Sequence, residues 1–183
     1  MVLAIRISLT PHPETPSGKV AAVEVELIAC PGDHLLISYF VTGAEHLIVP
    51  EWRTAVRRDG LWETTCFEAF LKPVGGLAYF EFNFSPSTEW AAYRFERHRE
   101  GRRDLPRPVD PFSTRGEEPS DPVLEVDLDL SGLPDVPMSL GLCAVIEEKG
   151  GNKSYWALAH PPGDPDFHNP SCFALELPAA RPA

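Results

Sequence analysis

Apolar and polar residues alternate with a period of two along much of this chain. Four runs show the pattern clearly: "VAAVEVELIA" from Val20, "HLLISYFV" from His34, "VLEVDLDL" from Val123 and "MSLGLCAVIEE" from Met138. Successive side chains of a β-strand point to opposite faces of a sheet, so this alternation predicts strands that are buried on one face. Gly, Pro, Asp and Asn stand between the runs, as is typical of turns.

The same pattern gives little support to helices. The 183-residue chain has 20 prolines, which would be hard to place among long helices because proline removes a backbone donor. Only Pro50–Arg58 has the composition of a short helix or turn. Counting the runs predicts an all-β, two-sheet antiparallel β-sandwich of about 10–12 strands. We interpret the irregular residues 102–122 as a loop, because strand-like sequence continues on both sides, and therefore expect one domain over residues 1–183.

Two glutamates interrupt the most hydrophobic of the predicted strands. Glu68 lies in "WETTCFEAFL", which starts at Trp62, and Glu81 lies in "YFEFNFSPSTEWAAYRF", which starts at Tyr79. Strands that pack in a core rarely carry carboxylates, because an unpaired buried charge is costly. The two glutamates therefore need partners.

The second stretch predicts a β-hairpin with a four-residue loop at residues 86–89. Placing Ser85 opposite Trp90 puts Glu81 directly across from Arg94, which makes an opposite-charge pair. The other face of the hairpin then carries a layer for the core: Phe80, Phe82, Phe84, Ala91, Tyr93 and Phe95.

If the two stretches form neighbouring strands, their polar side chains share one face. In the first stretch the alternation places Trp62 and Glu68 on that face and Phe67 on the other. Aromatic rings beside amides and charges suit a sugar, since rings pack on its apolar faces while fixed polar groups read its hydroxyls. We therefore predict a ligand-binding row made of Trp62, Glu68, Glu81, Asn83, Trp90 and Arg94. The alternative is a solvated outer face, on which Glu81 and Arg94 form an ordinary exposed pair.

Charge and cysteine usage narrow the partners. The formal net charge is −11 and the pI about 4.9, so nucleic acid and anionic membranes would be repelled. The chain has no signal-peptide pattern and no apolar run of the roughly 20 residues that span a bilayer, which predicts a soluble, cytoplasmic protein. The four cysteines are far apart in sequence and are expected to be free structural thiols: Cys30, Cys66, Cys143 and Cys172.

Three stretches together resemble a known group. "DGLWETTCFEAFL", "EFNFSPSTEWAAYRF" and "HPPGDPDFHNPSCFALEL" are similar to segments of the bacterial DOMON-like domains, which are related to family-nine carbohydrate-binding modules. The resemblance spans roughly Ala4 to Leu177 and contains no catalytic signature. It implies a β-sandwich that binds a small ligand, with sugars and haem as the known ligand classes.

The resemblance also implies site residues. In the sugar-binding relatives a tryptophan precedes a glutamate by six positions on one strand, a spacing that Trp62 and Glu68 match. An arginine follows on a later strand, and Arg94 is the candidate for it. The second aromatic wall has no certain match, and Tyr155 and Trp156 are both candidates for it.

Haem binding and catalysis are weaker alternatives. Haem needs axial side chains such as methionine and histidine, and the candidates are Met1, Met138, His160 and His168. Met138 begins an apolar strand, where core packing is the simpler role, so we expect no cofactor. Glu68 and Glu81 are the carboxylate pair that a glycosidase would need. Arg94 opposite Glu81 would keep that residue ionised, which suits binding better than proton donation.

A metal site is also weaker than its alternative. Glu125, Asp127 and Asp129 share one face of "LEVDLDL" and offer oxygens to a calcium ion. An outward-facing strand on an acidic protein accounts for them without a metal.

The sequence therefore predicts a non-catalytic β-sandwich that binds a small molecule, with a carbohydrate or similar polar compound as the expected class. The second hypothesis, from a different class, is a structural or protein-interaction domain with a buried polar network and no ligand. The exposure of Trp62 separates the two, because a fully buried Trp62 would favour the second.

Overall fold

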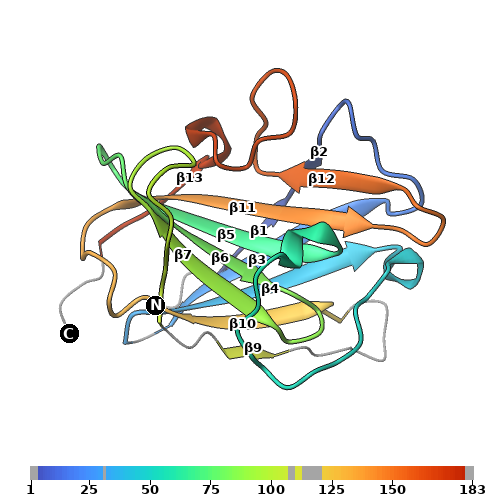
Figure 1. The fold of residues 1–183 in the computed structure, drawn as a ribbon, viewed down its shortest axis with the longest axis horizontal. Coiled ribbons are helices and arrows are strands. Elements are labelled where there is room, and N and C mark those ends of the chain that lie inside the picture. The colour runs from blue at the N-terminus through green and yellow to red at the C-terminus, as the bar shows by residue number, and fades with distance from the viewer. Residues whose placement is uncertain (1–3, 31, 107–109, 113–120, 180–183) are drawn as a thin grey trace.

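The computed structural model describes residues 4–30, 32–106, 110–112 and 121–179, and it consists of two antiparallel sheets packed face to face (Figure 1). This confirms the predicted all-β sandwich. Met1 and much of the predicted loop over residues 102–122 lie outside the described residues. No helix in the described part of the chain is long and apolar enough to cross a membrane.

The smaller sheet has five strands in the described part of the chain, and buried and partly exposed side chains alternate along most of Ala22–Cys30 and along Leu124–Asp129. Their order is β1 (Ala4–Ser8), β3 (Ala22–Cys30), β4 (His34–Thr42), β10 (Leu124–Asp129) and β9 (Asp110–Phe112). The face of β10 that carries Glu125 and Asp127 points outward, as predicted. There Glu125 accepts a hydrogen bond from Ser38 at 2.9 Å, and Asp127 lies 2.8 Å from the His34 ring.

The larger sheet has eight strands. Their order is β2 (Thr10–Pro11), β12 (Lys153–Ala157), β11 (Met138–Glu147), β5 (Cys66–Pro73), β6 (Tyr79–Phe84), β7 (Trp90–Phe95) and β8 (Arg103–Asp104), with β13 (Leu175–Leu177) also paired to β11. Three short 3-10 helices complete the described part: η1 (Ala44–His46), η2 (Leu61–Glu63) and η3 (Pro170–Cys172). Residues 50–58, where a short helix or turn was predicted, contain no helix.

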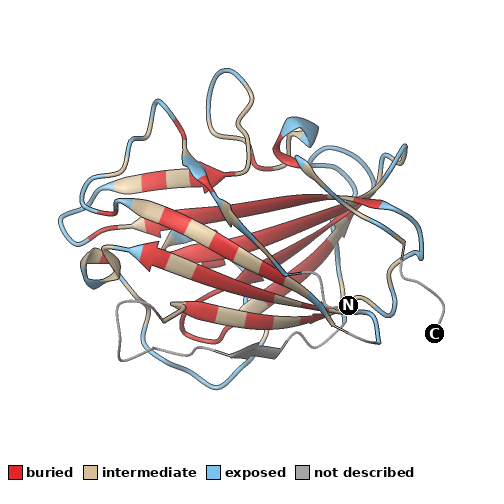
Figure 2. Ribbon diagram, turned by 180° about the vertical axis from the view of Figure 1, so that it is seen from behind, coloured by how far each residue is buried: buried red, intermediate tan, exposed pale blue. Residues whose placement is uncertain are grey.

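The main core lies between the sheets. Phe67, Leu71 and Phe82 contribute to it from the larger sheet, and Val25 and Ile37 from the smaller one. The strands β5 and β6 are buried at nearly every position, so both of their faces are covered (Figure 2). The inner face is the core of the sandwich, and the outer face of the same strands must be covered by something else.

The hairpin of β6 and β7 has a different register from the predicted one. Glu81 pairs with Tyr93, and Arg94 pairs with Phe80, so the prediction that Glu81 faces Arg94 is wrong by one residue. The loop is shorter than predicted because the Ser85 N–H donates to the Glu89 carbonyl at 2.9 Å.

Thr88 closes this loop in the left-handed region with a φ of 74°. A turn followed by one left-handed residue is the usual geometry of a three-residue hairpin loop. The shift moves Tyr93 and Phe95 to the outer face of the larger sheet and turns Arg94 toward the core side.

Candidate functional site

The outer face of the larger sheet carries a second apolar cluster with two carboxylates in it. The cluster is made of Leu61, Cys66, Phe70, Tyr79, Ala91, Tyr93, Phe95, Cys143, Val145, Ala157, Phe167, Cys172 and Phe173. On this face Glu68 pairs with Asn83 across β5 and β6, and Glu81 pairs with Phe70. The two carboxylates are therefore diagonal neighbours on adjacent strands, within reach of each other.

Two loops cover this face. One follows β7, and the other follows β12 and contributes Phe167 and Phe173 to the cluster. The Phe173 ring stacks on Phe70 with centroids 5.6 Å apart. Gly141 on β11 makes room for it, because a Cβ at that position would lie 2.6 Å from the Phe173 ring.

A cavity of about 460 Å³ remains between the sheet and its cover. Its lining comprises Trp62, Glu68, Glu81, Tyr93, Phe95, Arg99, Arg102, Val145, Tyr155, Pro165, Phe167 and His168. Glu68 and Glu81 are 4% and 5% exposed, whereas Trp62 is 39% exposed. Aromatic side chains and two buried carboxylates therefore line a space that reaches solvent.

Glu81 has a defined set of polar neighbours. Its Oε1 accepts a hydrogen bond from the Asn83 amide at 2.8 Å, and its Oε2 lies 3.6 Å from Nε2 of His168. Burial raises the pKa of Glu81 to about 7, although the Asn83 hydrogen bond and the charges of Arg99 and Arg102 oppose the shift. Near neutral pH this carboxyl therefore exchanges between its protonated and ionised forms.

Glu68 is more isolated. Burial raises the pKa of its carboxyl well above the usual range, and the charge of Glu81 adds to the effect. Among the described residues no side chain or backbone group hydrogen-bonds to this carboxyl, whose oxygens keep some accessible surface at the cavity. The thiols of Cys66 and Cys143 lie on the same face, and burial raises the pKa of each. A thiol that resists ionisation is a poor nucleophile.

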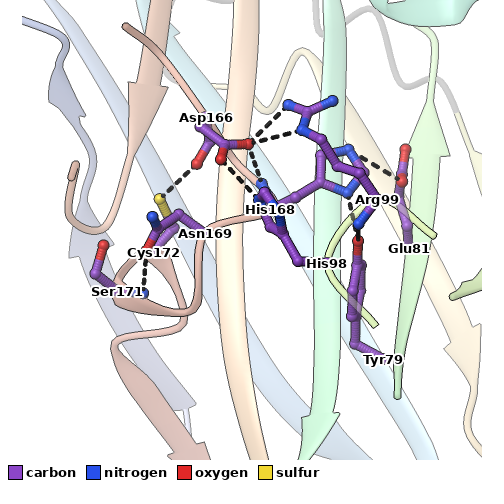
Figure 3. Close-up of polar contacts among 9 residues, drawn as sticks. All are labelled: Tyr79, Glu81, His98, Arg99, Asp166, His168, Asn169, Ser171 and Cys172. Atoms are coloured by element: carbon purple, nitrogen blue, oxygen red, sulfur yellow. Dashed lines mark hydrogen bonds and ion pairs between the residues drawn. The ribbon is translucent and has the colours of Figure 1, made fainter. Parts of the chain in front are cut away.

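A polar cluster holds the cover against the sheet (Figure 3). Asp166 accepts hydrogen bonds from Arg99 at 2.7 Å and from His98 at 2.9 Å. The Tyr79 hydroxyl accepts from the backbone N–H of Arg99 at 3.1 Å, so its own hydrogen is free for Nδ1 of His168, 2.7 Å away. Burial lowers the pKa of His168 to about 4, with the charge of Arg99 adding to the effect. His168 is therefore neutral near pH 7, and its Nε2–H points toward Glu81.

The predicted binding row divides between the two faces of the sheet. Trp62, Glu68, Glu81 and Tyr155 line the cavity, and Asn83 supports it by donating to Glu81. The remaining predicted residues, Trp90, Arg94 and Trp156, do not line it.

The shift in register explains two of these three differences. Trp90 packs against the core between the sheets, and Arg94 pairs with Phe80 on that same side. Trp156 is buried in the core, where its indole N–H donates to Ser154 at 2.9 Å. Strand alternation therefore places Tyr155, and not Trp156, at the cavity.

Sequence reasoning missed the contributions of the two covering loops. Arg99, Arg102, Phe167 and His168 line the cavity but lie in segments without periodicity, which no strand pattern can place. Tyr93 and Phe95 were placed on the core side because of the incorrect register. A three-residue hairpin loop in the prediction would have placed both rings on the outer face of the sheet.

Of the haem candidates within the described residues, only His168 lines the cavity, and the carboxylates considered for calcium lie on β10 of the smaller sheet. Met138 is packed in the core between the sheets, and His160 hydrogen-bonds to the Thr10 carbonyl at 2.8 Å. Across the described ranges there is no group of three or more His, Cys, Asp or Glu side chains placed to hold a metal ion. The four cysteines are free thiols.

Comparison with known proteins supports the fold. No protein-family model matches the chain, and no curated protein matches it. Among solved structures, the chain is similar to a "putative carbohydrate-binding protein" from Bacteroides uniformis, with a TM-score of 0.64 and 16% sequence identity. The match covers 93% of this chain and 84% of that one. At this identity the similarity establishes a shared β-sandwich architecture.

Proposed function

We propose that the protein is a non-catalytic ligand-binding domain, and that its cavity takes a carbohydrate or a similar polar small molecule. One observation carries the proposal: two buried carboxyls, Glu68 and Glu81, lie beside aromatic rings in a cavity of about 460 Å³. Pockets for small molecules commonly have this size and combine mostly apolar walls with a few fixed polar groups.

The chemistry of the lining suits a sugar. The rings of Trp62 and Tyr155 offer flat surfaces for the apolar faces of a pyranose. Glu68 and Glu81 accept hydrogen bonds from hydroxyls when ionised and also donate one when protonated. Asn83 fixes the Glu81 carboxyl at 2.8 Å, so part of this arrangement exists before a ligand arrives.

The comparisons point in the same direction. The similar Bacteroides structure is described as a "putative carbohydrate-binding protein", and the three stretches quoted above resemble DOMON-like domains. In that resemblance the cavity needs an arginine, which we assign to the loop after β7, where Arg99 and Arg102 line the cavity. Arg94, which was the candidate from the sequence, lies on the opposite face of the sheet and is not assigned this role.

Two alternatives have less support. A glycosidase needs one carboxyl kept protonated and the other held ionised, whereas burial raises the pKa of both Glu68 and Glu81 and no arginine or lysine of the described residues forms an ion pair with either. A structural domain with a filled polar network would bury Trp62, which instead is 39% exposed beside an open cavity.

The test is a calorimetric screen of monosaccharides, disaccharides and polar metabolites against the wild type, Trp62→Ala and Trp52→Ala. Trp52 is the matched control because it is 67% exposed and is not part of the cavity lining. We expect at least one binder whose affinity falls about tenfold or more in Trp62→Ala and stays unchanged in Trp52→Ala. Equal affinities in the two variants would mean that binding occurs elsewhere, and an absence of binders would refute the proposal.

A further inference from the structure

The two buried carboxyls in the cavity, Glu68 and Glu81, have no arginine or lysine paired with them among the described residues. Glu68 is 4% exposed and lines the cavity, yet within the described part of the chain only its backbone carbonyl, and not its carboxyl, has a hydrogen-bond partner. Glu81, diagonal to it, has only the Asn83 amide at 2.8 Å and the neutral His168 ring at 3.6 Å. A buried carboxylate normally has a cation or several donors beside it.

The two arginines of the lining do not fill this role. Arg99 donates twice to Oδ1 of Asp166, at 2.7 and 3.2 Å, and so is held by the cover. The Arg102 guanidinium lies over the Tyr93 ring, 5.0 Å from its centre. The charge of Arg99 acts through space on both carboxyls and that of Arg102 on Glu81. Neither arginine makes an ion pair with Glu68 or Glu81 at 4.0 Å or less in the residues described.

We propose that the cavity selects ligands that carry a protonated amine, which binds between Glu68 and Glu81. This inference rests on the proposed function and names its ligand class: amino sugars with an unsubstituted amine. An ammonium group has three donors and no acceptor. As a cation it favours the ionised form of both carboxyls, which release their protons to solvent on binding and then accept its charge-assisted hydrogen bonds.

The aromatic walls favour the same group. Tyr93, Tyr155 and Trp62 line the cavity with the carboxyls, and an ammonium group is attracted to the faces of such rings. A divalent metal ion suits the site less well, because calcium takes six to eight oxygen ligands. The described residues hold no cluster of three or more metal-binding side chains here or elsewhere.

The experiment measures affinity by calorimetry at pH 7 for matched sugars that differ only at carbon 2. The three sets are glucose, galactose and mannose, each with its 2-amino and its 2-acetamido form. The 1,4-diaminobutane dication tests an amine without a sugar ring, and Ca²⁺ alone tests a metal. The proteins are the wild type, Glu68→Gln, Glu81→Gln and Glu63→Gln. Glu63→Gln is the control, because Glu63 is an exposed glutamate of η2 that is not part of the lining.

We expect at least one amino sugar to bind about tenfold or more tightly than its hydroxyl and acetamido counterparts, as a charge-assisted hydrogen bond provides. Glu68→Gln and Glu81→Gln should each remove most of this preference, and Glu63→Gln should preserve it. Thermal unfolding of each variant verifies that it is folded. Two substituted positions keep the test valid if one variant is unstable.

The other outcomes separate this inference from the proposed function. If neutral sugars bind as tightly as their amino forms, the amine inference fails and the proposed function stands. If only the diamine binds, the amine inference stands and the carbohydrate class fails. If Ca²⁺ binds and no amine does, the carboxyls serve a metal and the inference is overturned. If nothing binds, both proposals fail.

Discussion

The two faces of β5 and β6 are equally buried and chemically different. On the inner face Phe67, Phe82 and Phe84 pack against the second sheet. On the outer face of the same strands Glu68, Glu81 and Asn83 lie beneath two loops. Burial alone therefore does not separate a core from a site. What separates them is the cover, because a packed sheet leaves no space, whereas the loops leave a cavity.

The difference also has an energetic side. The inner face contributes stability through apolar area removed from water. The outer face keeps two carboxyls in an environment that disfavours their charge, an arrangement that costs stability unless a ligand or a proton compensates. Proteins break local packing rules mainly at functional or strained positions, and we propose the carboxyl pair as a functional one.

The largest expected effect is on the inner face. Phe82→Ala removes a ring that is 2% exposed, and we expect a loss of about 3–5 kcal/mol in the free energy of unfolding. The folded fraction should keep its ligand affinity. Trp62→Ala is the opposite variant, with a stability loss below about 1 kcal/mol at a partly exposed position and a loss of binding. Urea denaturation measures the stability of both variants, and calorimetry measures their ligand affinity. A Phe82→Ala protein that folds and does not bind would show that the inner face also determines ligand binding.

The second prediction concerns pH. Because the pKa of Glu81 is about 7 in the folded protein against an ordinary 4.5, its contribution to stability is present below pH 4.5 and is lost as pH rises through 7. Relative to the wild type, Glu81→Gln should therefore gain about 3 kcal/mol between pH 4.5 and pH 8. The charge of Glu81 contributes to the raised pKa of Glu68, so the substitution also lowers the pKa of Glu68 toward its ordinary value, and this change acts in the same direction.

His168 opposes this trend in the wild type. Its pKa is about 4 against an ordinary 6.5, so its contribution is present above pH 6.5 and is lost as pH falls toward 4. Between pH 4.5 and 6.5 the two groups nearly cancel, which is why the comparison with Glu81→Gln is needed. Urea midpoints at several pH values measure the gap, and a gap independent of pH would mean that Glu81 is solvated.

The third prediction concerns the cover. Although burial opposes the effect, hydrogen bonds from His98 and Arg99 hold the pKa of Asp166 below its usual value. Asp166→Asn removes the charge from these partly exposed pairs, which should cost about 1 kcal/mol and speed amide exchange at Phe167 and His168. Asp164→Asn, at an exposed position two residues earlier, is the control. Unchanged exchange in Asp166→Asn would show that apolar contacts alone hold the cover.

The smallest expected effect is at Arg94. The predicted pairing with Glu81 would have made Arg94→Leu cost roughly 3–5 kcal/mol, as the loss of a buried partner does. In the observed register Arg94 pairs with Phe80 and has no ion pair within the described residues. We therefore expect a change below about 1 kcal/mol, with ligand affinity unaffected. A large loss that eases at low pH would support the predicted register instead.

The sequence was sufficient to predict the sandwich because burial on one face imposes a period of two, as in β3 and β10. It was also sufficient to place Glu68 and Glu81 on one face of the sheet. Trp62 lines the same cavity from η2, which precedes the strand, so the alternation used to place it does not apply. The register failed at a single residue: Thr88 adopts a φ of 74°, which a β-branched residue rarely does. The sequence of the loop contains no glycine or other residue typical of a left-handed conformation at this position. The predicted register was therefore shifted by one residue, which placed every β7 side chain on the wrong face.

The cover was not predictable in the same way. Residues 98–102 and 165–168 contribute Arg99, Arg102 and His168 to the cavity, but their positions depend on contacts with the finished sheet. Asp166 reaches Arg99 across 67 residues of sequence, and a pattern of neighbouring residues cannot encode such a contact. The strand half of the site therefore follows from periodicity, and the loop half follows only from the folded structure.

The most direct test of a ligand site on the outer face is carbon NMR of glutamate carboxyls. Protein labelled with ¹³C at the glutamate side-chain carboxyl is titrated at pH 7 with the sugar panel, with assignments from Glu68→Gln and Glu81→Gln. The account predicts that a binding sugar shifts the Glu68 and Glu81 signals and leaves those of Glu24 and Glu125, on the smaller sheet, in place. Shifts confined to glutamates of the smaller sheet, or no shift with any sugar, would contradict it.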